Sequence, residues 1–266
     1  MVLRGIRALR YSMQSSPSPS WCLWCCLPAS WLWRYSLKPF GLTFGAAPHW
    51  GPCWTRTVTT LLNRVEVDPA DPAFAKPTKP IGLVYTQDQA TRIAAEKHWA
   101  IAPDGDSFRR MVASPQPIQL PGLDPIRWLL ECGALVIAAG AGGIPVVRST
   151  DGHSLQGVEA VIDKALCSGL LARELKADCL IIATDVSAVF NNWGLPGLQT
   201  LGDVTPEILE KLDFPAGSMV PKVRAAVAFV RATGKRAVIG SLDQIQDMLS
   251  GIAGTQVGAN VAAKTL

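Results

Sequence analysis

The first 65 residues contain no aspartate or glutamate, and the first acidic side chain is that of Glu66. Seven of the 25 basic residues lie before it, which leaves 18 basic against 21 acidic residues from Glu66 onward. The overall net charge of +4 therefore belongs to the N-terminal part. No basic stripe with interleaved aromatic residues follows, so we expect no nucleic-acid surface.

The chain also has no apolar run of bilayer length. In the N-terminal part the longest such run, from Trp21 to Trp33, spans about thirteen residues, short of the roughly 20 that a membrane helix needs. We expect no transmembrane helix. Cys22, Cys25 and Cys26 have no second pair of cysteines or histidines at zinc-finger spacing, which argues against a metal site there.

Residues 1–56 differ in composition from the rest, since they hold six of the nine tryptophans and four of the seven cysteines. Arg4, Arg7 and Arg10 before a serine-rich stretch are compatible with a targeting segment. A metal or redox site is a second interpretation. We favour a third, a poorly ordered segment that is no evolved domain, because it shows no sustained period and no helix caps.

From residue 57 the pattern becomes that of an α/β protein. Apolar residues spaced by three and four from Val158 to Leu171 predict a helix, with Asp163 and Lys164 at the start of its second turn. The continuous apolar run from Cys179 to Ala183 predicts a strand covered on both faces. Thr184 and Asp185 then lie at its carboxyl end, the edge at which open α/β sheets bind ligands.

Other elements alternate in the same way. We expect a strand near 81–85, helices at 88–97, 124–132, 219–233 and 242–249, and strands at 134–139, 188–190 and 236–240. Residues 99–117 predict a hairpin that turns at Pro103-Asp104-Gly105. Alternation of this kind predicts an α/β fold, an open and mainly parallel sheet flanked by helices.

The sequence also predicts the state of three cysteines and offers two roles for a pair of arginines. Cys132, Cys167 and Cys179 lie in apolar surroundings and are expected to be buried free thiols, which suits a reducing cytoplasm. Arg109 and Arg110 on the hairpin have two interpretations, solvated strand charges or cations that face a substrate.

Four features together indicate phosphate binding. The loop Gly140-Ala141-Gly142-Gly143 would let backbone N–H groups approach phosphate oxygens, although a tight turn explains it equally well. Lys164 and Lys222 lie near helix starts and are able to act as point charges, although each alone is more often a solvated surface lysine. Asp185 would contact a nucleotide or cap the next turn.

These motifs resemble those of the carbamate kinases, which have the amino acid kinase fold. The resemblance is carried by GVEAVIDKALCSGLLARELKADCLIIATDVSAVF, AGAGGIPV, AGSMVPK, VEVDPADPAFAKPTKPIG and RRMVASPQP, and runs from about Thr57 to Val257. It implies an αβα sandwich that is incomplete at the N-terminus. It also implies three parts: residues 1–56 without a match, a link and protruding lid at 57–117, and a nucleotide-binding core at 118–266.

The resemblance further implies reversible phosphoryl transfer, in which ATP and carbamate give ADP and carbamoyl phosphate, as in arginine breakdown. Catalytic roles would fall to Lys164 and Lys222. The nucleotide would be bound by a larger set of residues, namely Gly140, Gly142, Gly143, Asp185, Val186, Ala216, Gly217, Ser218 and Met219. ATP or ADP with Mg²⁺ would be the cofactors, with no dedicated metal ligand. A cytoplasmic homodimer without membrane partners is expected.

Two departures from the family pattern bear on activity. The family's Gly-Gly-Asn and His-Gly-Asn-Gly-Pro loops have no counterpart in residues 1–56. Ala165 stands where the family has an aspartate that orients the neighbouring lysines. A catalytically impaired, nucleotide-binding member of the family is therefore the alternative to an active enzyme.

Overall fold

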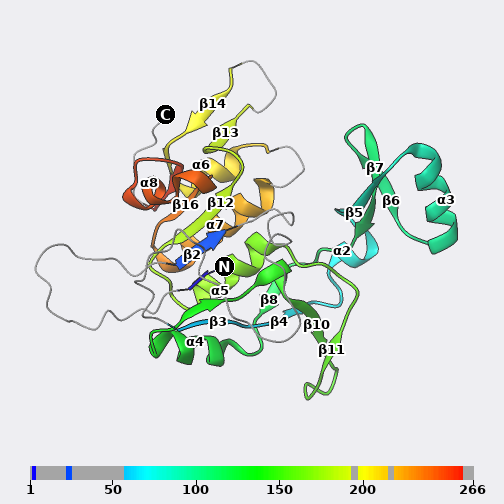
Figure 1. Cartoon of the computed structure of the whole chain (residues 1–266), viewed down its shortest axis with the longest axis horizontal. Helices are drawn as coiled ribbons and strands as arrows, with labels where there is room; N and C mark the ends of the chain where they lie inside the picture. Colours follow the sequence, from blue (N-terminus) through cyan, green and yellow to red (C-terminus); the bar gives the residue numbers. More distant parts are fainter. Residues whose placement is uncertain (1, 4–21, 26–56, 193–196, 215–218, 260–266) are drawn as a thin grey trace, which may run out of the picture.

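The computed structural model describes residues 2–3, 22–25, 57–192, 197–214 and 219–259. Its main sheet has the order β15-β17-β16-β12-β2-β1-β9-β3. These strands are β1 (Val2–Leu3), β2 (Cys22–Cys25), β3 (Val58–Thr60), β9 (Leu135–Ile137), β12 (Leu180–Thr184), β15 (Asp203–Val204), β16 (Ala237–Ser241) and β17 (Thr255–Val257). Figure 1 shows this sheet running through the larger part of the molecule.

Strand directions in this sheet are mixed. β12 is parallel to β16 and β2, β15 is parallel to β17, and β3 is parallel to β9. β1 is antiparallel to both β2 and β9, and β16 is antiparallel to β17. The prediction of an α/β sheet is confirmed, but the sheet is more mixed than the expected mainly parallel one.

Helices cover both faces of β12, as the alternation of side chains along a strand requires. Leu180 and Ile182 belong to the apolar core that includes α5 (Lys164–Glu174) and α7 (Met219–Thr233). Ile181 packs in a second cluster with Met248 of α8 (Ile245–Ser250). Every residue of β12 is buried, which explains why its sequence is continuously apolar rather than alternating.

Further elements flank the main sheet. A four-stranded sheet has the order β11-β10-β4-β8, and α4 (Leu123–Glu131) packs against β9. The strands are β4 (Arg64–Val67), β8 (Pro117–Gln119), β10 (Ile144–Arg148) and β11 (Leu155–Gly157). Near the C-terminal side lie β13 (Val189–Asn191), β14 (Gln199–Leu201), α6 (Pro206–Lys211) and the short η2 (Leu242–Gln244).

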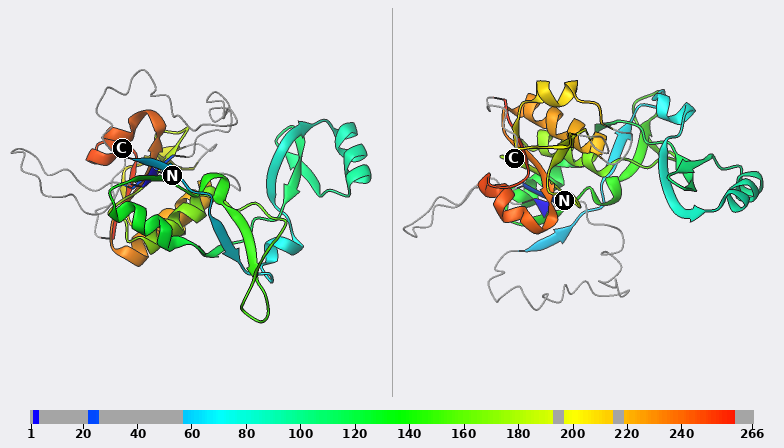
Figure 2. Two further views of the ribbon diagram at one scale, coloured as in Figure 1. Left: turned by 60° about the horizontal axis from the view of Figure 1, so that its bottom comes forward. Right: turned by 90° about the horizontal axis from the view of Figure 1, so that it is seen from above.

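A small sheet stands apart from this body (Figures 1 and 2). It follows α2 (Pro72–Ala75) and consists of β5 (Lys79–Tyr85), β6 (Ile101–Asp104) and β7 (Ser107–Val112) in the order β5-β7-β6. Helix α3 (Gln87–Lys97) packs on β5 and β7. The hairpin prediction is confirmed, because Asp104 pairs with Ser107 around Gly105 and Asp106.

Most predicted helices form, with shifts at their ends. α7 has the predicted bounds, and α3 ends at Lys97 as expected. Its cap is Thr86 rather than Asp88, because Thr86 and Gln89 form a reciprocal capping box. The C-terminal helix predicted at 242–249 is divided into η2 and α8.

The largest correction concerns the predicted helix from Val158. The helix α5 begins only at Lys164, and Asp163 is its N-cap instead of a residue in its second turn. The preceding backbone bonds to neighbouring segments: Val158 N donates to Pro145 O at 3.2 Å and Val161 N to Ala113 O at 2.9 Å. The apolar spacing continues through this non-helical stretch because Ile162 is buried in the same core as the residues of α5.

Cys132, Cys167 and Cys179 divide into two kinds. Cys167 and Cys179 are buried, and desolvation raises the pKa of Cys167 to about 12 and that of Cys179 to about 11. Cys132, which follows α4, is exposed, so the prediction of a buried thiol is wrong there. In the part of the chain that the structure describes, no helix is long and apolar enough to cross a membrane.

Thiol labelling tests this division. Iodoacetamide at pH 8 should modify Cys132 in the folded protein and leave Cys167 and Cys179 unmodified, because a buried thiol with a raised pKa forms almost no accessible thiolate. Peptide mass spectrometry gives the extent at each cysteine. The same reaction in denaturant should modify all three, and modification of Cys167 in native protein would contradict this packing.

Candidate active site

The glycine loop follows β9 as the 3-10 turn η1 (Gly140–Gly142). Gly142 and Gly143 have φ of 89° and 90°, in the left-handed region that favours glycine. A Cβ at Gly142 would overlap the carbonyl oxygen of Ile162, and one at Gly143 would come within 2.6 Å of the Asn63 side-chain nitrogen. Close packing therefore requires these two glycines, whereas a Cβ at Gly140 would meet nothing within 4 Å.

Asn63 forms hydrogen bonds with the residues on both sides of this loop. Its side-chain oxygen accepts a hydrogen bond from Ala139 N at 2.7 Å, and its backbone oxygen accepts one from Ile144 N at 2.9 Å. The side chain is buried, with only 7% of the residue exposed. One asparagine thus fixes both ends of the glycine loop. Asn63 is not recognisable from the sequence, since a lone asparagine between two strands carries no motif.

The N-terminus of α5 touches the same loop. Asp163 Oδ1 accepts hydrogen bonds from Ala165 N at 2.8 Å and Leu166 N at 3.3 Å. Its other oxygen forms an ion pair with Lys79 Nζ at 2.8 Å. Lys164 is the first residue of the helix and is exposed, as expected of a lysine able to reach a ligand or solvent.

Lys222 lies in the first turn of α7 and is buried, with 6% of the residue exposed. The interpretation of Lys222 as a solvated surface lysine is therefore wrong. A buried ammonium must be compensated by nearby polar or negative groups. One contributor is Asp185, whose pKa is lowered by a hydrogen bond from Thr184 Oγ1 at 2.9 Å and, to a smaller extent, by the charge of Lys222.

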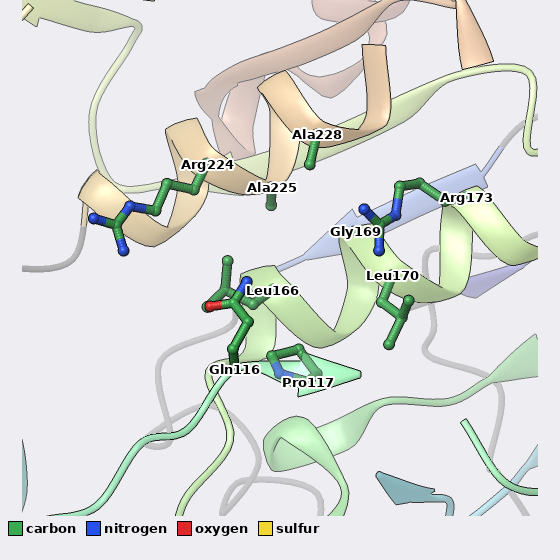
Figure 3. A pocket seen from close by; sticks show the side chains of 9 residues that line it. All are labelled: Gln116, Pro117, Leu166, Gly169, Leu170, Arg173, Arg224, Ala225 and Ala228. Atoms are coloured by element: carbon green, nitrogen blue, oxygen red, sulfur yellow. The ribbon is translucent and has the colours of Figure 1, made fainter. Parts of the chain in front are cut away.

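Helices α5 and α7 run side by side in the same direction. Figure 3 shows the pocket beside them, which Gln116 and Pro117 also line, with Leu166 and Arg224 toward one end and Arg173 toward the other. The helices approach closely because Gly169 has no side chain: a Cβ there would lie only 3.0 Å from the Cβ of Ala225. Their N-termini therefore lie at one end of the pair, so the positive ends of both helix dipoles add there.

These pieces form one region of the molecule. It combines the glycine loop, the starts of α5 and α7, and the carboxyl end of β12, where Asp185 follows. Backbone N–H groups, helix N-termini and lysine ammonium groups are the donors that proteins use for phosphate. A site of this composition can position and neutralise a phosphoryl group, and phosphoryl transfer of this kind requires no covalent nucleophile.

Other predicted site residues are placed as follows. Val186, which follows Asp185, is half-buried. Met219, the first residue of α7, is half-buried as well. Ala216, Gly217 and Ser218 lie outside the described residues. No group of three or more histidine, cysteine, aspartate or glutamate side chains that could hold a metal ion occurs within the described ranges.

Arg109 and Arg110 fit neither interpretation fully. Arg109 donates to Gly82 O at 2.9 Å and pairs with Asp104 at 3.3 Å, both within the small sheet. Arg110 pairs with Glu159 at 2.6 Å and lies 4.2 Å from the centroid of the Trp99 ring. Both guanidinium groups therefore have intramolecular partners.

Comparison with known proteins agrees with this geometry. The model of the amino acid kinase family matches residues 102–241, which is more than half of the chain. The chain therefore belongs to the amino acid kinase family, within which it stands with the carbamate kinases.

Two curated carbamate kinases illustrate the similarity. That of Haemophilus influenzae is 56% identical over 198 residues, and that of Rhizobium meliloti is 48% identical over 204 residues. These alignments cover 74% and 76% of this chain but only 64% and 63% of the relatives. The chain thus spans less than two thirds of their length.

Solved structures show the same relationship. The carbamate kinase from Giardia lamblia bound to AMP-PNP is 37% identical and superposes with a TM-score of 0.68, covering 77% of this chain and 66% of that one. The same enzyme bound to citric acid gives a TM-score of 0.71. The amino acid kinase fold expected from the sequence is confirmed.

The glycine loop generates a stability test. Gly142→Ala should lower the free energy of unfolding by about 2–4 kcal/mol, because the new methyl group overlaps Ile162 O and the backbone has positive φ. Gly140→Ala is the matched control and should change it by less than about 0.5 kcal/mol. Urea unfolding followed by circular dichroism measures both, and equal effects of the two substitutions would contradict the described loop.

Proposed function

We propose that this chain carries out carbamate kinase-type phosphoryl transfer, in which ATP and carbamate are interconverted with ADP and carbamoyl phosphate. The observation that carries the proposal is the burial of Lys222 at the start of α7, where its charge contributes to the lowered pKa of Asp185. A lysine is kept buried and charged where a site needs a fixed positive charge.

In the direction of ATP formation, an oxygen of the ADP β-phosphate attacks the phosphorus of carbamoyl phosphate. The bond between phosphorus and the carbamate oxygen breaks, and carbamate leaves with the electron pair. Lys222 and Lys164 would neutralise charge on the transferring group. The glycine loop of Gly140, Gly142 and Gly143 would let the group come close to the backbone, although the N–H groups of Gly142 and Gly143 already donate to Ala139 O and Gly140 O, each at 3.1 Å. The reaction needs positioning and cations more than covalent catalysis.

The nucleotide would bind near Asp185, Val186, Met219 and the preceding residues 216–218. A Mg²⁺ ion would arrive with the nucleotide phosphates and be held mainly by them and by water, which suits the ion's preference for few protein ligands. The N-terminus of α7 at Met219 would attract the same negative charge. A cytoplasmic location and a homodimer belong to the same proposal.

Replacement of Lys222 tests the proposal. Lys222→Met keeps much of the buried volume and removes the charge, so ATP formation from ADP and carbamoyl phosphate should fall about 100-fold or more. Lys211→Met, at the exposed end of α6, is the control and should retain full activity. A coupled luciferase assay measures the rate, and circular dichroism verifies that both variants fold.

An unchanged rate in Lys222→Met would overturn the assignment of this lysine. Absence of any rate above background in the unmodified protein would overturn the activity itself.

A second candidate is a nucleotide-binding protein without turnover. Ala165 favours it, because only 3% of this residue is exposed and its methyl group faces the core, where the family resemblance implies an orienting carboxylate. Position 165 then contributes no negative charge that could orient the two lysines. If this second function is correct, ADP should raise the melting temperature of the protein while no ATP is formed from ADP and carbamoyl phosphate.

A further inference from the structure

Residues 158–163, here called the junction segment, connect β11 to α5 and touch several parts of the molecule. Val161 N donates to Ala113 O at 2.9 Å, just beyond the end of β7. The Ile162 carbonyl fills the space that a side chain at position 142 would occupy. Asp163 caps α5. A shift of this segment would therefore move the glycine loop and the start of α5 together.

Two cations of the small sheet bind the junction segment. Lys79 pairs with Asp163 at 2.8 Å, and Arg110 pairs with Glu159 at 2.6 Å. Register explains why they act together: in the β5–β7 ladder Ile81 lies opposite Arg110, two residues from Lys79. Residues two apart share a face of a strand, so Lys79 and Arg110 project from the same face of the small sheet.

Arg110 is held in place independently of its carboxylate partner. Its guanidinium lies 4.2 Å from the centroid of the Trp99 ring, and its side chain is only 23% exposed. The Glu159 side chain is 84% exposed, so this ion pair alone contributes little to stability. A stacked, planar guanidinium loses little freedom on binding a carboxylate, which suits it to fix a geometry.

We propose that Arg110, stacked on Trp99 and paired with Glu159, is a positioning residue that sets the placement of the small sheet relative to the glycine loop and the α5 N-terminus. This inference rests on the proposed function for its kinetic consequence. It extends that function because it gives Arg110 and Glu159 a role without contact with the nucleotide. The small sheet and the phosphate region are then coupled through the junction segment.

Hydrogen exchange tests the coupling without any ligand. Arg110→Met keeps part of the apolar stem and removes the charge, and Glu159→Gln removes the partner charge. Either change should speed amide exchange at Val161 and in residues 79–112 about two- to fivefold, the range expected for loss of one exposed ion pair. Arg127→Met, which breaks the Arg127–Asp124 pair of equal 2.6 Å length on α4, is the matched control.

Kinetics then separate positioning from general destabilisation. In Arg110→Met, kcat for ATP formation should fall about tenfold while KM for ADP stays within about twofold, because the displaced geometry concerns the phosphoryl group and not the nucleotide. The double variant Arg110→Glu with Glu159→Arg should recover part of the exchange protection and of the rate.

The outcomes are distinguishable. Exchange at Val161 that is as slow in Arg110→Met as in Arg127→Met overturns the positioning role, whatever the rates show. Faster exchange in a protein that forms no ATP in any variant supports the coupling and overturns only the proposed function. A fall in kcat that the Glu159→Gln variant does not share also overturns the role of the pair.

Discussion

The carboxylate of Asp163 takes part in two interactions on which the arrangement of the site depends. One oxygen caps the first turn of α5, and the other binds Lys79 at the start of the small sheet. Because a carboxylate at a helix start also complements the helix dipole, the cap fixes where α5 begins. The position of Lys164, the first residue of the helix, follows from that cap.

Packing around this point leaves little freedom. The glycine loop fits against Ile162 only because residue 142 has no side chain, and Asn63 holds the loop from its other side. On the neighbouring helix, Gly169 allows close approach to Ala225, which brings α7 and its buried Lys222 beside α5. Close-packed interiors transmit displacements, so a shift of Ile162 would move the glycine loop and the start of α5 together.

Much of the site could be predicted from local sequence. Apolar spacing from Met219 to Thr233 gave the bounds of α7, and the continuous apolar run before Thr184 placed Asp185 at the end of a strand. The same spacing misled at Val158 to Ile162, where the backbone is not helical but Ile162 is buried and Val158 packs against the same core. Periodicity reports which residues face a core, and it does not report the backbone bonds that decide between the two conformations.

The sequence alone determined the family, the candidate lysines and the glycine loop, because these are encoded by residue type and spacing along the chain. Tertiary structure decided that Lys222 is buried while Lys164 is exposed, that Cys132 is accessible, and that Lys79 and Arg110 reach the segment before α5. Each of these depends on residues distant in sequence: Lys79 and Asp163 are 84 positions apart. Burial and ion pairing arise only when the fold brings such groups together, so no local pattern can contain them.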